Sequence, residues 1–178
     1  MPLLEIVRYG TPSLQQRSEP VGEITDEIHA LIACMIETMY AAKGVGLAAP
    51  QVGRNIRLFV ADSEQVTEGG RNPRVFINPE MLDESIEDGP YTEGCLSIPN
   101  IEGEVFRPLR VKVRAQNEHG GAFIVEADDL LARVIQHEID HLNGVLFIDR
   151  MSKEARMALA GQLSALRRET QEALTRAG

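Results

Sequence analysis

Apolar residues recur at three- and four-residue spacing between positions 28 and 39, which predicts a helix with one core-facing stripe. Thr25 provides an N-cap hydroxyl, and Asp26 and Glu27 place negative charge at the positive end of the helix dipole. We expect this helix to end near Gly44. The stripe consists of Ile28, Leu31, Ile32, Met35, Ile36 and Met39.

The middle of the chain is typical of strands. Residues 56–62 (IRLFVAD) and 74–82 (RVFINPEML) are rich in β-branched and aromatic residues, and a polar loop at 63–73 separates them. In residues 104–117, Leu109, Val111 and Val113 alternate with basic side chains, which predicts a half-buried strand. A hairpin turn at 118–121 leads into another predicted strand at 122–127.

The last third of the chain returns to helical patterns. Asp128 begins a helix that ends at Asn143 and Gly144, a short strand is expected at 145–149 (VLFID), and a charged helix is expected over about 152–176. The order of helix, several strands, helix, strand and helix predicts an α+β fold with mostly antiparallel pairing. A length of 178 residues is consistent with one domain, residues 1–178.

Composition narrows the function classes. Eighteen basic and 27 acidic side chains give a net charge of −9, which argues against a sequence-specific nucleic-acid groove or an anionic membrane surface as the main partner. No apolar run is long enough for a membrane-spanning helix, and the first residues lack the pattern of a signal peptide. Cys34 and Cys95 do not resemble a disulfide framework, so we expect a cytoplasmic, reduced protein.

The candidate chemistry lies in QHEIDHLNG, residues 136–144. His137 and His141 are separated by about 400° and about 6 Å along a helix, so both can direct an imidazole at one metal ion. Glu138 is displaced by about 100° from His137, which suits a general base better than a ligand. Leu130 and Val134 continue an apolar stripe toward His137, which favours a buried metal site over two exposed histidines.

Two histidines leave the third ligand open. Phe147 stands where a longer histidine pattern would place it, and Glu154 and Glu169 lie on the terminal helix without a motif around them. Cys95, within TEGCLSIPNIEG at 92–103, would by itself be a buried structural thiol. Beside an incomplete histidine pair it is the best candidate, because a thiolate is a good ligand for a borderline divalent ion. Such a set leaves one coordination position for water.

The stretches GVGLAAPQ, EGCLS and QHEIDH, in this order and together with the opening LLEIVRYGTPSL, resemble the peptide deformylases. The resemblance implies antiparallel sheets packed around the helix that carries H-E-x-x-H, with further helices near both ends. It also implies a hydrolase that removes the formyl group from N-terminal formyl-methionine of newly synthesised polypeptides and releases formate. Fe²⁺ is the expected ion, with Zn²⁺, Ni²⁺ and Co²⁺ as alternatives.

The resemblance also implies roles for individual residues. Glu138 matches the catalytic acid and base, and Gln51 and the Leu96 N–H match the groups that stabilise the oxyanion. The expected metal ligands are Cys95, His137 and His141, and the expected substrate contacts are Val45, Gly46, Glu93, Gly94, Leu130 and Val134. The chain departs from the family pattern at Glu102, where many deformylases have arginine, which leaves the peptide preference beyond methionine open.

Two rival hypotheses remain at this point: a metallopeptidase with another third ligand, and a metal-binding or ribosome-associated module without turnover. An intact Glu138 argues against the second, because a structural site does not need a base. The expected partners are N-formylmethionyl nascent peptides. The terminal helix is either a ribosome-docking element or a solvated helix, the protein is expected to be a monomer, and an organellar location is the alternative if a leader has been removed.

Overall fold

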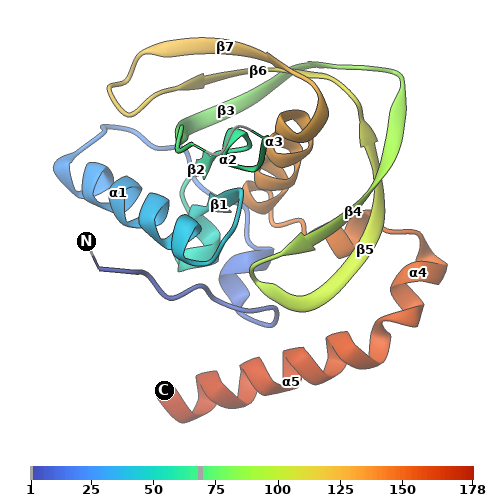
Figure 1. Cartoon of the computed structure of the whole chain (residues 1–178). Helices are drawn as coiled ribbons and strands as arrows, with labels where there is room; N and C mark the ends of the chain where they lie inside the picture. Colours follow the sequence, from blue (N-terminus) through green and yellow to red (C-terminus); the bar gives the residue numbers. More distant parts are fainter. Residues whose placement is uncertain (1, 68–69) are drawn as a thin grey trace.

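The computed structural model describes residues 2–67 and 70–178 and is built on two antiparallel sheets (Figure 1). The larger sheet has the strand order β1-β2-β3-β6-β7, and the smaller one is the hairpin β4-β5. The strands span Gly46–Ala48 (β1), Leu58–Ala61 (β2), Arg74–Glu84 (β3), Asp88–Cys95 (β4), Ile98–Pro108 (β5), Val111–Gln116 (β6) and Ala122–Ala127 (β7).

A helix packs against each face of the larger sheet. Strand β2 is buried on both faces, with Leu58 and Val60 in the core formed with α1 (Asp26–Ala41) and Phe59 and Ala61 in the core formed with α3 (Asp129–Leu142). Successive side chains of a strand point to opposite faces, so a four-residue apolar strand supplies both cores. On its other side, helix α3 faces the β4-β5 hairpin, so it lies between the large sheet and the hairpin, as Figure 1 shows.

A third core connects the two ends of the chain. The 3₁₀ helix η1 (Pro12–Gln15), strand β5 and η3 (Phe147–Arg150) pack together with α5 (Ala160–Ala177), which runs along the outside of the molecule (Figure 1). The remaining elements are α2 (Glu64–Thr67), η2 (Ala49–Val52) and α4 (Lys153–Ala158). None of the helices in the described residues has the length and apolarity needed to cross a membrane.

The predicted α+β fold with antiparallel pairing is confirmed, as are the helix after Thr25 and the hairpin at 118–121. The strand expected at VLFID is wrong. Residues 147–150 form η3 instead, because the Asp149 carboxylate accepts a hydrogen bond from the Leu146 N–H and closes a turn. Leu109 is likewise exposed (40%) between β5 and β6 rather than within a strand.

Two further expectations are modified. The terminal helix is interrupted at Leu159, so it consists of α4 and α5. The polar loop predicted at 63–73 contains the short helix α2, and residues 68 and 69 of that loop lie outside the described part of the chain.

Candidate metal centre and active site

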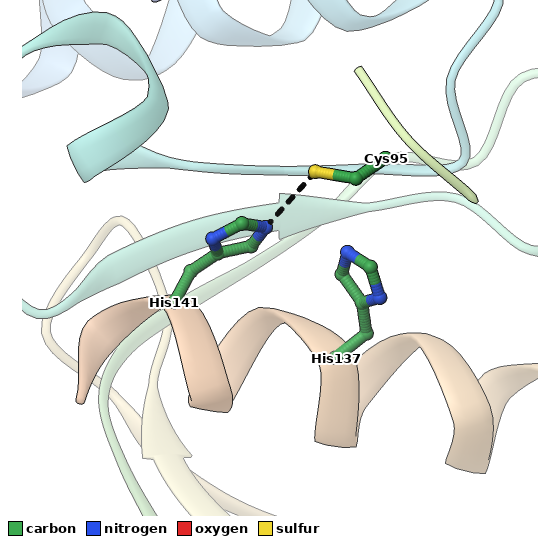
Figure 2. Close-up of side chains that lie close together, drawn as sticks. All are labelled: Cys95, His137 and His141. Atoms are coloured by element: carbon green, nitrogen blue, oxygen red, sulfur yellow. Dashed lines mark hydrogen bonds between the residues drawn. The ribbon is translucent and has the colours of Figure 1, made fainter. Parts of the chain in front are cut away.

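Helix α3 and the end of β4 bring three metal-ligating side chains together (Figure 2). His137 and His141 lie on successive turns of α3, with ring centroids 5.0 Å apart, and Cys95 Sγ lies 3.4 Å from His141 Nε2. The ligand atoms of all three residues lie within 4.8 Å of one another. Ligands at about 2.0–2.3 Å from one tetrahedral ion are about 3.5 Å apart, so this donor set can bind a single divalent metal ion.

The β4-β5 hairpin positions Cys95 through an irregularity in its register. Gly94 pairs with Glu102, but the next residue, Cys95, pairs with Ile98, so residues 99–101 form a bulge on β5. Asn100 within the bulge has a φ of 64°, a left-handed conformation that asparagine tolerates. The tight turn at residues 96–97 then leaves Cys95 facing α3.

His137 is oriented by a carboxylate beneath the helix. Its Nδ1 lies 2.9 Å from Glu93 Oε1, so an N–H donated to Glu93 leaves Nε2 for the metal. Burial alone would raise the pKa of Glu93, but hydrogen bonds from His137 and Arg107 and the charge on Arg107 outweigh it and lower that pKa to about 2. Glu93 is thus ionised whenever the protein is folded at neutral pH.

Glu93 belongs to a buried network of ion pairs. Arg107 donates to both Glu93 oxygens (2.7 and 3.0 Å) and to Asp140 Oδ2 (2.8 Å), and Arg133 donates to Glu93 Oε2 (3.1 Å). Arg150 donates to the other oxygen of Asp140, Oδ1, at 2.9 Å. Because each buried charge has an oppositely charged partner, the network fixes Glu93 and hence the His137 ring.

The His141 side of the site is apolar in comparison. Its ring is fully buried, and within the described residues its Nδ1 has no hydrogen-bond partner. Burial, together with the charges on His137 and Arg107, lowers the pKa of His141 well below its ordinary value. The ring therefore stays neutral, which is the protonation state that a metal ligand requires.

Glu138 lies in a tight, apolar position beside the three candidate ligands. Only 2% of it is exposed, and burial raises the pKa of its carboxyl to about 7, with the charge on His137 opposing this and that on Glu93 adding to it. A Cβ added at Gly46 would lie 3.0 Å from Glu138 Cγ and Cδ and from Val134 Cγ1. Glycine at position 46 therefore allows β1 to approach the carboxylate this closely. A carboxyl that titrates near neutral pH is suited to proton transfer.

The Gln51 amide is held in one orientation by three contacts. Its Oε1 accepts from the Ala48 N–H at 2.9 Å, which directs Nε2 toward Ser97 Oγ (3.2 Å) and Cys95 Sγ (3.5 Å). Gln51 and Ser97 are both fully buried. An N–H donor is thus fixed next to Cys95, where negative charge on a substrate oxygen could be stabilised.

A cavity of about 620 Å³ opens in front of these groups. The substrate contacts expected from the sequence all line it, together with Gln51, Cys95, Leu96, His137 and Glu138, whereas His141 is buried behind it. Glu93 contributes to the lining, but both its oxygens are bound to His137 and to arginines, so its geometry fits a positioning role better than the substrate contact expected.

Sequence reasoning missed the charged network and Ser97. Arg107 could have been suspected, because it follows Val105 at a spacing of two and so lies on the buried face of β5. A charged side chain on the buried face of a strand needs an oppositely charged or hydrogen-bonding partner that is also buried. The identity of those partners, Glu93 and Asp140, follows from strand register and helix packing that no local pattern encodes.

The comparisons with known proteins agree with this geometry. A family model described as polypeptide deformylase matches residues 3–157. A peptide deformylase of Acinetobacter baumannii is 49% identical over 95% of this chain and 94% of its own. The crystal structure of a Synechococcus elongatus peptide deformylase in complex with actinonin is similar (TM-score 0.84, 43% identity, 91% and 89% of the two chains covered). The crystal structure of a peptide deformylase from Thermotoga maritima is also similar (TM-score 0.80, 45% identity, 85% and 99% of the two chains covered).

Proposed function

The chain belongs to the polypeptide deformylase family, and we propose that Cys95, His137 and His141 bind the metal ion of its deformylase reaction. The protein is a hydrolase that removes the formyl group from the N-terminal formyl-methionine of polypeptides. The observation that carries the proposal is the convergence of one thiol and two imidazoles at the cavity, with the Glu138 carboxyl beside them.

Glu138 acts as both base and acid in the proposed mechanism. A divalent ion bound by the three ligands would polarise the formyl carbonyl and acidify a water molecule. Glu138 takes the proton of the water that attacks the formyl carbon, and it then delivers this proton to the departing amine nitrogen. The C–N bond breaks, which yields formate and a free N-terminus. A carboxyl with a pKa near neutrality can make both transfers at neutral pH.

The remaining residues of the cavity bind and orient the substrate. The Gln51 amide and the Leu96 N–H stabilise the charge that develops on the formyl oxygen, a contribution of about 3–4 kcal/mol per donor in comparable sites. Leu130 and Val134, on the face of α3 that lines the cavity, form the apolar wall for the methionine side chain. The other wall consists of Val45, Gly46 and Gly94.

We propose Fe²⁺ as the native ion, with Zn²⁺, Ni²⁺ and Co²⁺ as alternatives, because one thiolate and two imidazoles suit several divalent metals of borderline softness. Metal analysis of protein purified without oxygen, combined with the activity of each reconstituted form, distinguishes them. With iron, activity is expected to decay in air, because Fe²⁺ and the Cys95 thiolate are both oxidisable. Full activity of the zinc form would contradict iron as the native metal.

Several broader expectations are proposals as well. One catalytic domain over residues 1–178 is supported by the third core, which joins Tyr9 and Leu14 to Leu163 and Leu166. Ribosome association is supported only by the exposed arginines of α5, which suit an anionic RNA surface. We also propose a monomer located in the cytoplasm, where nascent chains are made and a free thiol such as Cys95 stays reduced.

Formate release from a formyl-Met-Ala peptide tests the activity directly. Iron-loaded, anaerobically purified protein is expected to release formate, and no release would refute the proposal. Cys95→Ala and Cys95→Asp separate this site from a metallopeptidase with another third ligand. The alanine variant is expected to lose metal and activity together, whereas unchanged metal content and activity would show that Cys95 is not a ligand.

A further inference from the structure

The cavity carries an unneutralised carboxylate at its mouth. Glu102 on β5 lines the cavity and is exposed, and in residues 2–67 and 70–178 it forms no ion pair. Glu93 and Arg133, which also line the cavity, are paired with each other. Lys43, in the turn after α1, is the only other exposed charge among the cavity-lining residues described.

Glu102 lies on the strand paired with the one that carries Cys95. It is the cross-strand partner of Gly94, the residue before Cys95, and a Cβ added at Gly94 would lie 3.6 Å from Glu102 Cγ. The stem of Glu102 therefore covers Gly94, and glycine leaves room above the strand for a bound peptide. A peptide whose formyl group reaches the proposed ligands fills this cavity, so the residues that follow its methionine extend along a lining that includes Glu102.

We propose that Glu102 makes the enzyme favour formyl-methionyl peptides with a lysine or arginine soon after the methionine; this rests on the deformylase function proposed above. An exposed carboxylate interacts weakly with a cation, so the preference for lysine over glutamate is about two- to five-fold in kcat/KM at low ionic strength. Salt screens the interaction, so the preference decreases as ionic strength rises. Lys43, in the turn between α1 and β1, decreases this preference, because its positive charge repels a basic peptide side chain.

The test compares kcat/KM for formyl-Met-Xaa-Ala and formyl-Met-Ala-Xaa peptides, with Xaa as lysine, glutamine or glutamate, using metal-loaded enzyme. The ratio of lysine to glutamate is expected to exceed one at one of the two positions, to fall to about one in Glu102→Gln, and to increase in Lys43→Gln. Glu104→Gln is the matched control, because Glu104 is exposed on the same strand but does not line the cavity.

The outcomes separate this inference from the proposed function. Formate release at equal rates from all charged peptides overturns the role of Glu102 and leaves the deformylase assignment intact, whereas no release from any peptide refutes the deformylase assignment. A preference that survives in Glu102→Gln assigns the selectivity to another group. A preference lost equally in Glu104→Gln assigns it to the overall negative charge of the protein.

Discussion

Two carboxylates lie next to His137, and their surroundings give them opposite chemistry. Glu93, in the network beneath α3, is bound by His137, Arg107 and Arg133, and its pKa falls to about 2. Glu138, one residue after His137, lies against Gly46 and Val134, and its pKa rises to about 7. Both are almost fully buried, so burial alone does not decide the charge state. The neighbouring groups decide it. Hydrogen-bond donors keep Glu93 ionised, whereas Glu138 has few donors around it and can exchange a proton near neutral pH.

The largest effect is expected from a substitution that removes the proton-exchanging carboxyl of Glu138. Glu138→Gln keeps the size of the side chain but cannot accept a proton, so turnover is expected to fall by about 10²- to 10⁴-fold. The metal content should stay the same, because Glu138 is not one of the three proposed ligands. Formate release and metal analysis of the same sample check this. Loss of metal together with activity would show that Glu138 is structural.

The two carboxylates should also affect the stability of the metal-free protein with opposite sign. The raised pKa of Glu138 means that its contribution to the free energy of unfolding is present below pH 4.5 and is lost as pH rises toward 7. The lowered pKa of Glu93 means that its contribution is present above pH 4.5 and is lost as pH falls toward 2. Each change amounts to a few kcal/mol, at about 1.4 kcal/mol per pKa unit.

Urea unfolding of the chelator-treated protein across pH 2–7 measures both changes. The wild type minus Glu138→Gln difference should vary chiefly between about pH 4.5 and 7. The wild type minus Glu93→Gln difference should vary chiefly between about pH 2 and 4.5, with a smaller change up to pH 7, because the charge on Glu93 also raises the pKa of Glu138. If both differences varied in the same pH range and direction, the contrast between the carboxylates would be wrong.

A smaller effect is expected on metal binding. Glu93→Gln weakens the hydrogen bond to His137 Nδ1 and leaves Asp140 as the charged partner of Arg107, so metal affinity should decrease by about 10- to 100-fold. Competition with a chelator of known affinity measures this, and Glu104→Gln is an exposed control on the paired strand. An affinity within twofold of the wild type would mean that the network does not orient His137.

The smallest expected effect tests the tight environment of Glu138. In Gly46→Ala the new methyl group would lie 3.0 Å from the Glu138 side chain, so the carboxylate must shift, and kcat is expected to fall by about tenfold. Gly22→Ala is the control, because nothing lies within 4 Å of a Cβ at that position. Equal kcat values for the two variants would show that the position of Glu138 tolerates displacement.

Local patterns carried the prediction furthest where one helix decides the geometry. The spacing of His137, Glu138 and His141 predicted two ligands and a base on α3, and Gly144 marked the end of the helix, where its φ is 75°. Gly144 also packs against Gln15, since a Cβ there would lie 2.8 Å from the Gln15 backbone. The roles proposed for Gln51 and Leu96 rest on the resemblance to the deformylases, because spacing alone does not assign them.

Patterns failed where the outcome depends on residues far apart in the chain. The role of Glu93 requires Arg107 from the paired strand and Asp140 from α3, and the position of Cys95 requires a bulge on β5. VLFID has the apolar residues of a strand, but the Asp149 side chain competes for the Leu146 N–H and forms a turn. Substrate contacts were predicted as one class, although Glu93 and Val134 face different surroundings.

The third core has a consequence for the order in which the molecule folds during its own synthesis. Tyr9 and Leu14 are translated long before Leu163 and Leu166 of α5, yet these residues pack together, and Cys95 packs against the same core. Contacts between such distant residues form late. The core against which Cys95, the proposed thiolate ligand, packs is therefore completed only after α5 has been translated.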